Sequence, residues 1–410
     1  MIRRVGDGTP GRTGREQAAG AAPAARNAPP PPSLAEIVRQ WGRIGCIGFG
    51  GPPAHIALLR ELCVTRRRWL SDTDFERALA AVNVLPGPAS TQLSIYCAWR
   101  LRGYRGAVLG GVCFILPGLI LILALSALFL AGSPPRWVRG AGMGAGAAVA
   151  AVAVRAGLDI AVPIWARTRG RRRLHVLAYA LAGAIAAAIT GPWLVIVLLA
   201  CGAVELMAAR GRAPLRLNAG AWPLLAGAVA DPAGLPALLW MALKIGALAF
   251  GGGFVIVPLM QADAVGAHHW MTHGQFLDAV ALGQVTPGPL VQTVAAVGYA
   301  AGGLGWGLLA ALVAFLPSFS FVLLGAARFE RLLGDGRALT FLAGAAPAAA
   351  GAIVGAAIPL TEALGRTWQY PLLVAAAVAL LLARLPIVPV LLASGAVGVL
   401  AALLGAPLLR

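Results

Sequence analysis

Long apolar stretches alternate with short polar segments along most of this chain. A helix that crosses a bilayer needs about 20 predominantly apolar residues, and no stretch shows the strict alternation of a half-buried strand. Runs of spanning length occupy 106–131, 140–163, 174–190, 192–209, 306–327, 339–363 and 371–404. The pattern predicts an all-α, polytopic membrane protein.

Four further apolar segments contain helix breakers. One pair covers 35–63 and 74–99, interrupted at Gly50 to Pro53 and at Pro86 to Pro88. The other pair covers 235–262 and 275–301. Proline removes a backbone donor and cannot continue a helix, and backbone groups freed at membrane depth need partners in protein or water. We therefore expect broken or re-entrant helices that line a cavity or an interface.

The second pair of broken segments repeats the first at a constant offset of 201 positions. Phe49-Gly50-Gly51 returns as Phe250-Gly251-Gly252, and Pro86-Gly87-Pro88 returns as Pro287-Gly288-Pro289. This register predicts a tandem duplication, each half having two broken segments followed by about four plainer helices. The predicted divisions are a disordered cytoplasmic tail (1–33), an amino-terminal repeat (34–212), a connector (213–234) and a carboxy-terminal repeat (235–410).

Composition excludes a soluble protein. The 410 residues are 59% hydrophobic and only 12% charged, against about 25% charged in soluble domains. The net charge of +18 does not indicate nucleic-acid binding, because the arginines lie at the ends of apolar runs, as in cytoplasmic loops of membrane proteins. No catalytic triad pattern, phosphate-binding loop or nucleotide fingerprint is present. The sequence therefore predicts no enzyme and no cofactor.

Loop charges predict that the two halves have opposite orientations. Half one carries arginine clusters near 60–68, 100–105, 167–173 and 210–216, whereas the equivalents of the first two clusters, 263–274 and 301–305, have no Lys or Arg. Because cytoplasmic loops are enriched in cations, half two is expected to be inverted. The inversion needs an extra crossing, for which 217–230 is the candidate. Its roughly 14 residues rise only about 21 Å as a helix.

The repeated breaks predict an oxyanion site near the midplane. A helix N-terminus offers free N–H groups and the positive end of its dipole, and neutral amides and hydroxyls around such ends could bind an oxyanion and release it. The alternative is that these polar side chains only satisfy backbone freed by proline. The candidate substrate-binding residues are Phe49, Gly50, Gly51, Asn83, Pro86, Gly87, Pro88, Ser90, Thr91, Gln92, Phe250, Gly251, Gly252, Gln284, Thr286, Pro287, Gly288, Pro289, Gln292 and Thr293.

Four ionisable residues are candidates for attracting the anion or for coupling. Arg43 and Lys244, the only lysine, are equivalent positions six residues before each Phe-Gly-Gly; they either act in transport or extend to the membrane surface. Asp278 could relay protons. His55 either donates a hydrogen bond near the site or is a satisfied interior imidazole.

Other polar residues are better explained locally. Ser71 followed by Asp74 fits a loose capping box, so Asp72 and Asp74 are expected at a helix start rather than in a proton relay. His269 and His273 have i,i+4 spacing, but no carboxylate or cysteine completes a metal site. We therefore predict no bound metal.

Several of these motifs resemble one transporter family. Phe49-Gly50-Gly51-Pro52, Trp69-Leu70-Ser71-Asp72 and the run from Leu85 to Gln92 resemble the amino-terminal half of chromate transporters. Leu243-Lys244-Ile245-Gly246 and the run from Gly283 to Pro289 resemble the carboxy-terminal half. The likeness covers roughly 34–404. The chain departs from the family pattern in a shorter connector and in Asn83, where glutamine is more usual.

The resemblance implies a multi-pass carrier of the cell inner membrane. It would export chromate, driven by protons or by the membrane potential, and so confer chromate resistance. Sulfate would be the competing oxyanion, and the alternative function is uptake of sulfate or another oxyanion. The expected partners are chromate and membrane lipid, with no nucleic acid, and a homodimer is left open.

Overall fold

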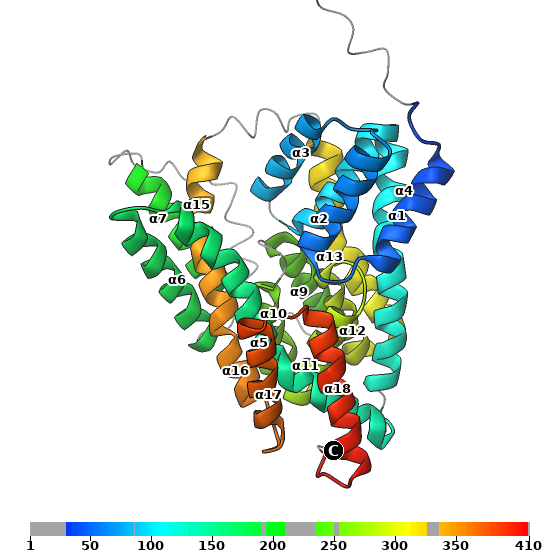
Figure 1. Cartoon of the computed structure of the whole chain (residues 1–410), viewed down its shortest axis with the longest axis vertical. Coiled ribbons are helices and arrows are strands. Elements are labelled where there is room, and N and C mark those ends of the chain that lie inside the picture. Colours follow the sequence, from blue (N-terminus) through cyan, green and yellow to red (C-terminus); the bar gives the residue numbers. More distant parts are fainter. Residues whose placement is uncertain are drawn as a thin grey trace, which may run out of the picture.

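The computed structural model describes residues 30–85, 87–130, 132–189, 194–209, 234–249, 254–325 and 336–408. Every regular element in these ranges is a helix (Figure 1), so the all-α prediction is confirmed for the described part of the chain. Five helices are long and apolar enough to cross a membrane: Ala89–Phe129, Arg136–Arg167, Arg172–Ile189, Leu304–Gly325 and Leu339–Glu362. The described part thus forms a polytopic helical membrane protein.

The first broken segment is a re-entrant hairpin. Helix α1 (Leu34–Ile47) is followed after the Gly-Gly break by α2 (Pro52–Arg60), which continues as the π-helical turn η1 (Glu61–Arg66). Arg67, just after η1, lies 2.9 Å from Glu36 in the first turn of α1. The segment therefore returns to the face from which it entered.

The second broken segment returns to that same face. Helix α3 (Asp72–Val84) leads into Pro86-Gly87-Pro88, and α4 (Ala89–Phe129) follows. Arg100 on α4 lies 3.7 Å from Asp74 in the first turn of α3. Helix α4 then changes direction at Gly103, where the backbone is left-handed (φ 59°), and its second part crosses the molecule.

Half two reproduces these elements at the same offset. The counterparts are α9 (Leu235–Leu248), α10 (Ile256–Gln261) with η4 (Ala262–Ala267), α11 (His273–Val285), and η5 (Leu290–Gln292) with α12 (Thr293–Gly302). Both tips contain a left-handed non-glycine residue, Arg68 (φ 52°) and His269 (φ 53°). Both then start a helix with a side-chain cap, from Ser71 and from Thr272. The duplication extends to individual backbone angles.

The two halves are inverted with respect to one another. Helix α13 (Leu304–Gly325) is the repeat equivalent of the second part of α4. Gly111 of α4 faces Phe319 of α13, and Gly307 of α13 faces Leu123 of α4. Because the start of each segment lies against the end of the other, the equivalents run antiparallel. Figure 1 shows α2 and α3 in the upper part of the molecule and α10, α11 and α12 in the lower part.

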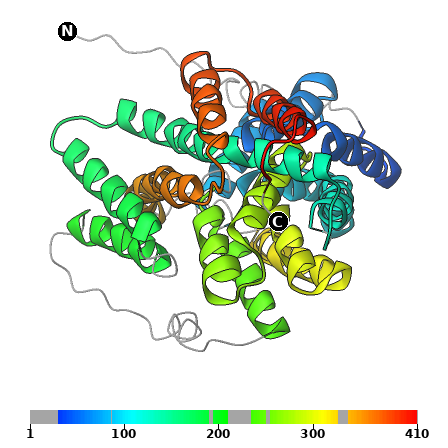
Figure 2. The ribbon, with the colours of Figure 1, turned by 90° about the horizontal axis from the view of Figure 1, so that it is seen from below.

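The remaining helices exchange partners between the halves. They are α5 (Arg136–Arg167), α6 (Arg172–Ile189), α7 (Leu194–Ala209), α15 (Gly336–Gly355), α16 (Ala357–Glu362), α17 (Gln369–Ala377) with η7 (Val378–Leu382), and α18 (Ile387–Leu403). Helix α5 of half one packs on α17 and α18, and α15 of half two packs on α6 and α7. Figure 2 shows the green α6 and α7 beside the orange α15, away from the yellow α13.

Glycines permit this exchange. Gly144 of α5 lies against the carbonyl oxygen of Ser394 on α18, and Gly351 of α15 lies against that of Ala180 on α6. In lipid, helices gain little from hydrophobicity and associate through such close backbone approach. The exchange ties each half to the other, so neither peripheral group of helices belongs to one repeat.

One predicted apolar run is divided into two helices in the structure. The run 371–404 is not a single helix, because Arg384 is left-handed (φ 53°) and Pro386 caps α18, and a residue that precedes proline disfavours helix. Residues 1–29 of the predicted tail, residues 213–233 of the predicted connector with its candidate crossing 217–230, Pro86 and 250–253 lie outside the described residues.

Candidate functional site

The first Gly-Gly break of half one meets the Pro-Gly-Pro loop of half two. The carbonyl oxygen of Gly48, just after α1, accepts hydrogen bonds from the Gly288 amide and from His55 Nε2, each at 2.9 Å. His55 Nδ1 lies 3.2 Å from Ser90 Oγ at the start of α4. This junction joins both breaks of half one to the second break of half two.

The hydrogen bonds of His55 fix its tautomer. A carbonyl oxygen only accepts, so Nε2 carries the hydrogen and Nδ1 accepts from the Ser90 hydroxyl in the neutral ring. The imidazole is fully buried and stands edge-on to Phe114, with ring centroids 5.0 Å apart. His55 is therefore a satisfied interior imidazole that also lies inside the site, which combines both interpretations drawn from the sequence.

The first Pro-Gly-Pro loop makes the reciprocal contact. Gly87 has a left-handed backbone (φ 112°), which favours glycine, and a side chain there would meet Gln92, the Gly246 carbonyl oxygen of α9 and Ser318 of α13. Each Pro-Gly-Pro loop thus packs against the end of the first broken helix in the opposite half. The inverted repeat thus brings Gly288 to Gly48 and Gly87 to Gly246.

Part of the polar cluster satisfies freed backbone. Gln292 Nε2 donates to the Pro287 carbonyl oxygen and to Thr286 Oγ1, each at 2.9 Å. Thr286 donates to the Leu282 carbonyl oxygen at 2.8 Å, and Thr293 donates to that of Leu290 at 2.7 Å. For these donors the backbone explanation holds.

Other buried polar atoms at the junction have no hydrogen-bond partner within the described part of the chain. They are Thr91 Oγ1, Gln292 Oε1 and Ser318 Oγ, and Gln284 Nε2, two residues before Thr286 in the chain, is also unpaired. Burying an unpaired polar group is unfavourable, so these atoms require water or a ligand. Ser318 was missed from the sequence, although a hydroxyl directly after Pro317 in an apolar span was a usable signal.

The other candidate residues differ in burial and position. Asn83 is exposed and lines a cavity of about 140 Å³ together with Gly87 of the junction and Leu248 at the end of α9. Phe49 and Gly50 are exposed beside the first break, and Gly51 caps α2 there. Pro88 and Pro289 cap α4 and η5, whereas Pro86, Phe250, Gly251 and Gly252 lie outside the described residues.

The start of α2 corrects one expectation about helix ends. The helix begins with Pro52 and Pro53, and proline has no backbone N–H. Two of the orphan donors that a helix start usually presents are therefore missing. The start of α4, which carries Ser90 and Thr91, keeps its donors, so the four helix ends are not equivalent as anion sites.

The ionisable candidates lie in different environments. Arg43 is exposed. Lys244 instead forms an ion pair with Asp263 of η4, with Nζ 2.6 Å from Oδ2, a partner the sequence did not reveal. Asp278 of α11 faces Gly142 of α5, where the missing side chain leaves room for its carboxylate, and it does not reach the junction.

Four acidic residues between the two breaks of half one form ion pairs at the surface. Asp72 and Glu76 pair with Arg60, Asp74 with Arg100, and Glu61 with Arg66. Ser71 caps α3 by accepting a hydrogen bond from the Asp74 amide at 3.0 Å. The predicted helix start at Ser71 is confirmed.

Two inverted halves with breaks that meet in the interior define a polytopic membrane protein of the inverted-repeat transporter type. The family model for "Chromate transporter" matches residues 35–206 and 236–399. The chain belongs to the chromate transporter family, as the motif resemblance indicated.

Curated relatives extend over both halves. The chain is 34% identical to a chromate transport protein of Pseudomonas aeruginosa over 348 residues, which cover 82% of each chain. It is 32% identical to a chromate transport protein of Cupriavidus metallidurans, over 80% of this chain and 83% of that protein. It is 29% identical to a probable chromate transport protein of Synechococcus elongatus, over 80% and 84%. No solved structure matches.

Proposed function

We propose that this protein is a secondary active transporter that exports chromate across the inner membrane, driven by protons or by the membrane potential, and so confers chromate resistance. The observation that carries the proposal is the reciprocal junction of the breaks, in which Gly48 accepts from Gly288 and Gly87 packs against α9 and α13. Family membership and the names of the relatives support chromate as the substrate.

The chemistry of the junction suits a transported oxyanion. Its buried side chains are neutral, namely His55, Ser90, Thr91, Gln292 and Ser318. Neutral donors and helix starts stabilise an anion, and without a fixed cation the anion can leave again. Thr91 and Ser318 hydroxyls have no partner within the described residues, so they are available to a bound tetrahedral dianion.

The inverted repeat supplies a mechanism for alternating access. Junction residues from both halves surround one place, and a pseudo-two-fold axis relates its two approaches. Because α5 and α15 are exchanged between halves, we propose that the broken-helix core moves against the two peripheral groups of helices, rather than half one moving against half two.

The direct test is uptake of labelled chromate into inside-out vesicles. Export predicts energy-dependent accumulation that an uncoupler abolishes and that excess sulfate reduces. If accumulation occurs only in right-side-out vesicles, the protein is an uptake carrier. No energy-dependent flux in either orientation would reject the transport proposal.

Substitutions test the position of the site. We expect Gln92→Ala and Gln284→Ala each to abolish chromate resistance in cells while the protein remains in the membrane. Thr168→Ala, at the exposed end of α5 away from the junction, is the matched control and should retain resistance. Full resistance in both glutamine variants would contradict the proposal that the substrate binds at the junction.

A further inference from the structure

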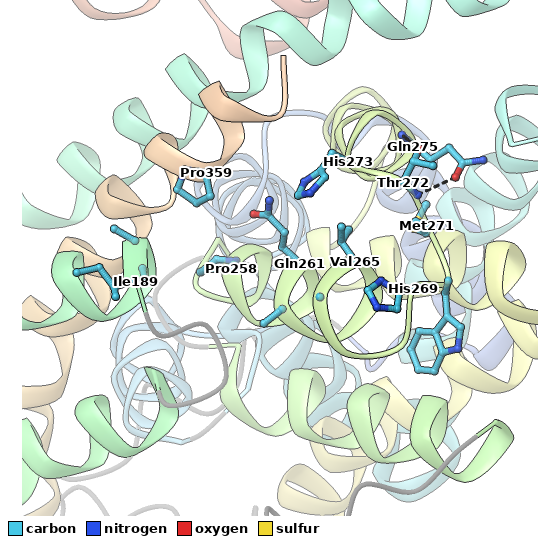
Figure 3. Close-up of a pocket in the computed structure, with 15 residues that line it drawn as sticks. Ile189, Pro258, Gln261, Val265, His269, Met271, Thr272, His273, Gln275 and Pro359 are labelled. Atoms are coloured by element: carbon cyan, nitrogen blue, oxygen red, sulfur yellow. Dashed lines mark hydrogen bonds between the residues drawn. The ribbon is translucent and has the colours of Figure 1, made fainter. Parts of the chain in front are cut away.

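A second cavity, with a mostly apolar lining that also includes several polar side chains, lies at the tip of half two. Its volume is about 720 Å³. We call residues 60–76 the first tip and residues 261–277 the second tip. The cavity is formed by the second tip, by α10, by the end of α6 and by Pro359 of α16. Figure 3 shows Gln261 and His273 extending into this space, with Ile189 and Pro359 on its other side.

Gln261 is the group in this cavity that most needs a ligand. Its side chain is on the last residue of α10, the residue is only 8% exposed, and its Oε1 has no hydrogen-bond partner within the described residues. Because Oε1 is enclosed, the Nε2 end of the amide is the end that can face the cavity, and it is a hydrogen-bond donor. A buried amide left unpaired is unfavourable, which indicates that water or a ligand completes it.

The rest of the polar lining favours an anion. Among the described residues, the cavity lining contains no Asp, Glu, Lys or Arg, so an anion meets no repelling carboxylate and no permanent cation there. His269 and His273 supply imidazole donors. Thr272 and Gln275 bond each other in a capping box, which fixes the position of His273 at the start of α11.

The repeat shows that this chemistry is specific to half two. The positions equivalent to Gln261 and His273 are Arg60 and Asp72, which pair at 3.3 Å. In half one the same place is therefore occupied by an ion pair, and in half two the corresponding side chains leave an open, uncharged cavity.

The cavity adjoins a short helix of the broken segment. Gln261 ends α10, whose six residues span about 9 Å, and α10 follows the second Phe-Gly-Gly in the sequence.

We infer that this cavity is a vestibule in which the transported oxyanion binds on the extracytoplasmic side, held by Gln261 and His273. The inference rests on the proposed function. The absence of Lys and Arg from 263–274 assigns this face to the outside by the positive-inside rule. The ligand class is a tetrahedral dianion such as chromate or sulfate.

The first test measures chromate transport kinetics of the full chain in proteoliposomes. Gln261→Met keeps the side-chain length and removes the amide, and His273→Ala removes the imidazole. Each should raise KM for chromate about three- to ten-fold, the cost of one lost hydrogen bond, with little change in kcat. Leu403→Ala, at an exposed residue of α18 outside the cavity lining, should leave KM unchanged. An unchanged KM in both polar variants would overturn the vestibule.

The second test reports location. In a variant without the five native cysteines, Gln261→Cys should react with a membrane-impermeant thiol reagent added outside, and chromate should slow the reaction. Labelling only from the cytoplasmic side, or no protection by chromate or sulfate, would reject the inference. Absence of chromate flux in the wild-type protein would instead reject the proposed function, so the two failures are distinguishable.

A third test introduces the Arg60–Asp72 ion pair of half one at the equivalent positions of half two. Gln261→Arg combined with His273→Asp should close the vestibule and lower chromate flux at least ten-fold, while each polar single variant remains active at high chromate. Wild-type flux in this double variant, with the protein correctly folded by gel filtration, would contradict a passage through the cavity.

Discussion

The first and second tips follow the same backbone path with different side chains. Arg67 places its guanidinium 5.6 Å from the Trp69 ring in the first tip, and the equivalent His268 stacks on Trp270 at 4.5 Å in the second. Arg60, Asp72 and Glu76 form ion pairs in the first tip, where the second has Gln261, His273 and Leu277. The backbone is fixed by turns and caps common to both, whereas surface charge has diverged.

The different arginine content of the two tips explains how one duplicated unit can occupy two orientations in the membrane. Loops rich in Lys and Arg favour the cytoplasmic side, so the arginines of the first tip favour a cytoplasmic position for that tip. The second tip has no Lys or Arg, so the same rule does not oppose its position on the other side. Loss of charge from the second tip also leaves the cavity around Gln261 open.

The largest expected effect concerns the sides of the membrane on which the two tips lie, which thiol labelling can test. Thr65 and Gly266 are equivalent and both exposed. In a background without native cysteines, Thr65→Cys should react with an impermeant thiol reagent only from the cytoplasmic side, and Gly266→Cys only from outside. If both cysteine variants react from the same side, the two tips lie on one face of the membrane and the inverted topology is contradicted.

The next largest effect concerns the packing that both halves share. Gly45 and Gly246 lie against backbone carbonyl oxygens of α4 and α13, and a methyl group on Gly246 would overlap the Ala314 oxygen. Gly246→Ala should destabilise the protein by at least about 2 kcal/mol, seen as a lower melting temperature in detergent.

The control lies in the same half. Gly266 has open space around it, so Gly266→Ala should leave the melting temperature unchanged. Gly45→Ala should behave like Gly246→Ala if the halves are built alike. Equal stability of all three variants would mean that the close approach of α9 to α13 does not exist.

An ion pair found only in half two gives an intermediate effect. The side chains of Lys244 and Asp263 are 19% and 11% exposed, and the position equivalent to Asp263 is Leu62. Asp263→Asn leaves a largely buried cation unpaired and should cost about 3 kcal/mol, measured by thermal unfolding. Lys244→Met combined with Asp263→Leu should recover most of that loss. A double variant as unstable as Asp263→Asn would contradict this pairing.

The smallest effect is expected at the first tip. Arg60→Gln copies the second tip at that position, but Arg60 and its two partners are all substantially exposed, and such ion pairs contribute at most about 1 kcal/mol. Stability and chromate resistance should stay close to wild type. A large loss would show that the ion pairs of the first tip hold the hairpin together.

Much of the fold could be predicted from the sequence because its signals are local. Proline and glycine interrupt helices wherever they stand, so the breaks near Gly50 and Pro287 appear in the pattern itself. The side chains of Ser71 and Thr272 start helices by accepting hydrogen bonds from backbone amides only three residues along the chain. The site was harder to predict. Asn83 is exposed and its equivalent Gln284 is partly buried, since equivalent positions in inverted halves acquire different neighbours.

The membrane class, the duplication, the broken segments and the absence of Lys and Arg from 263–274 could all be read from the sequence. Each depends on composition or on residues close together in the chain. Only the tertiary structure decided that α5 and α15 change partners between the halves, that Gly48 meets Gly288, and that Lys244 pairs with Asp263. These contacts join distant segments. A duplicated sequence offers two similar surfaces for each helix, and only the packing of particular glycines and charges selects between them.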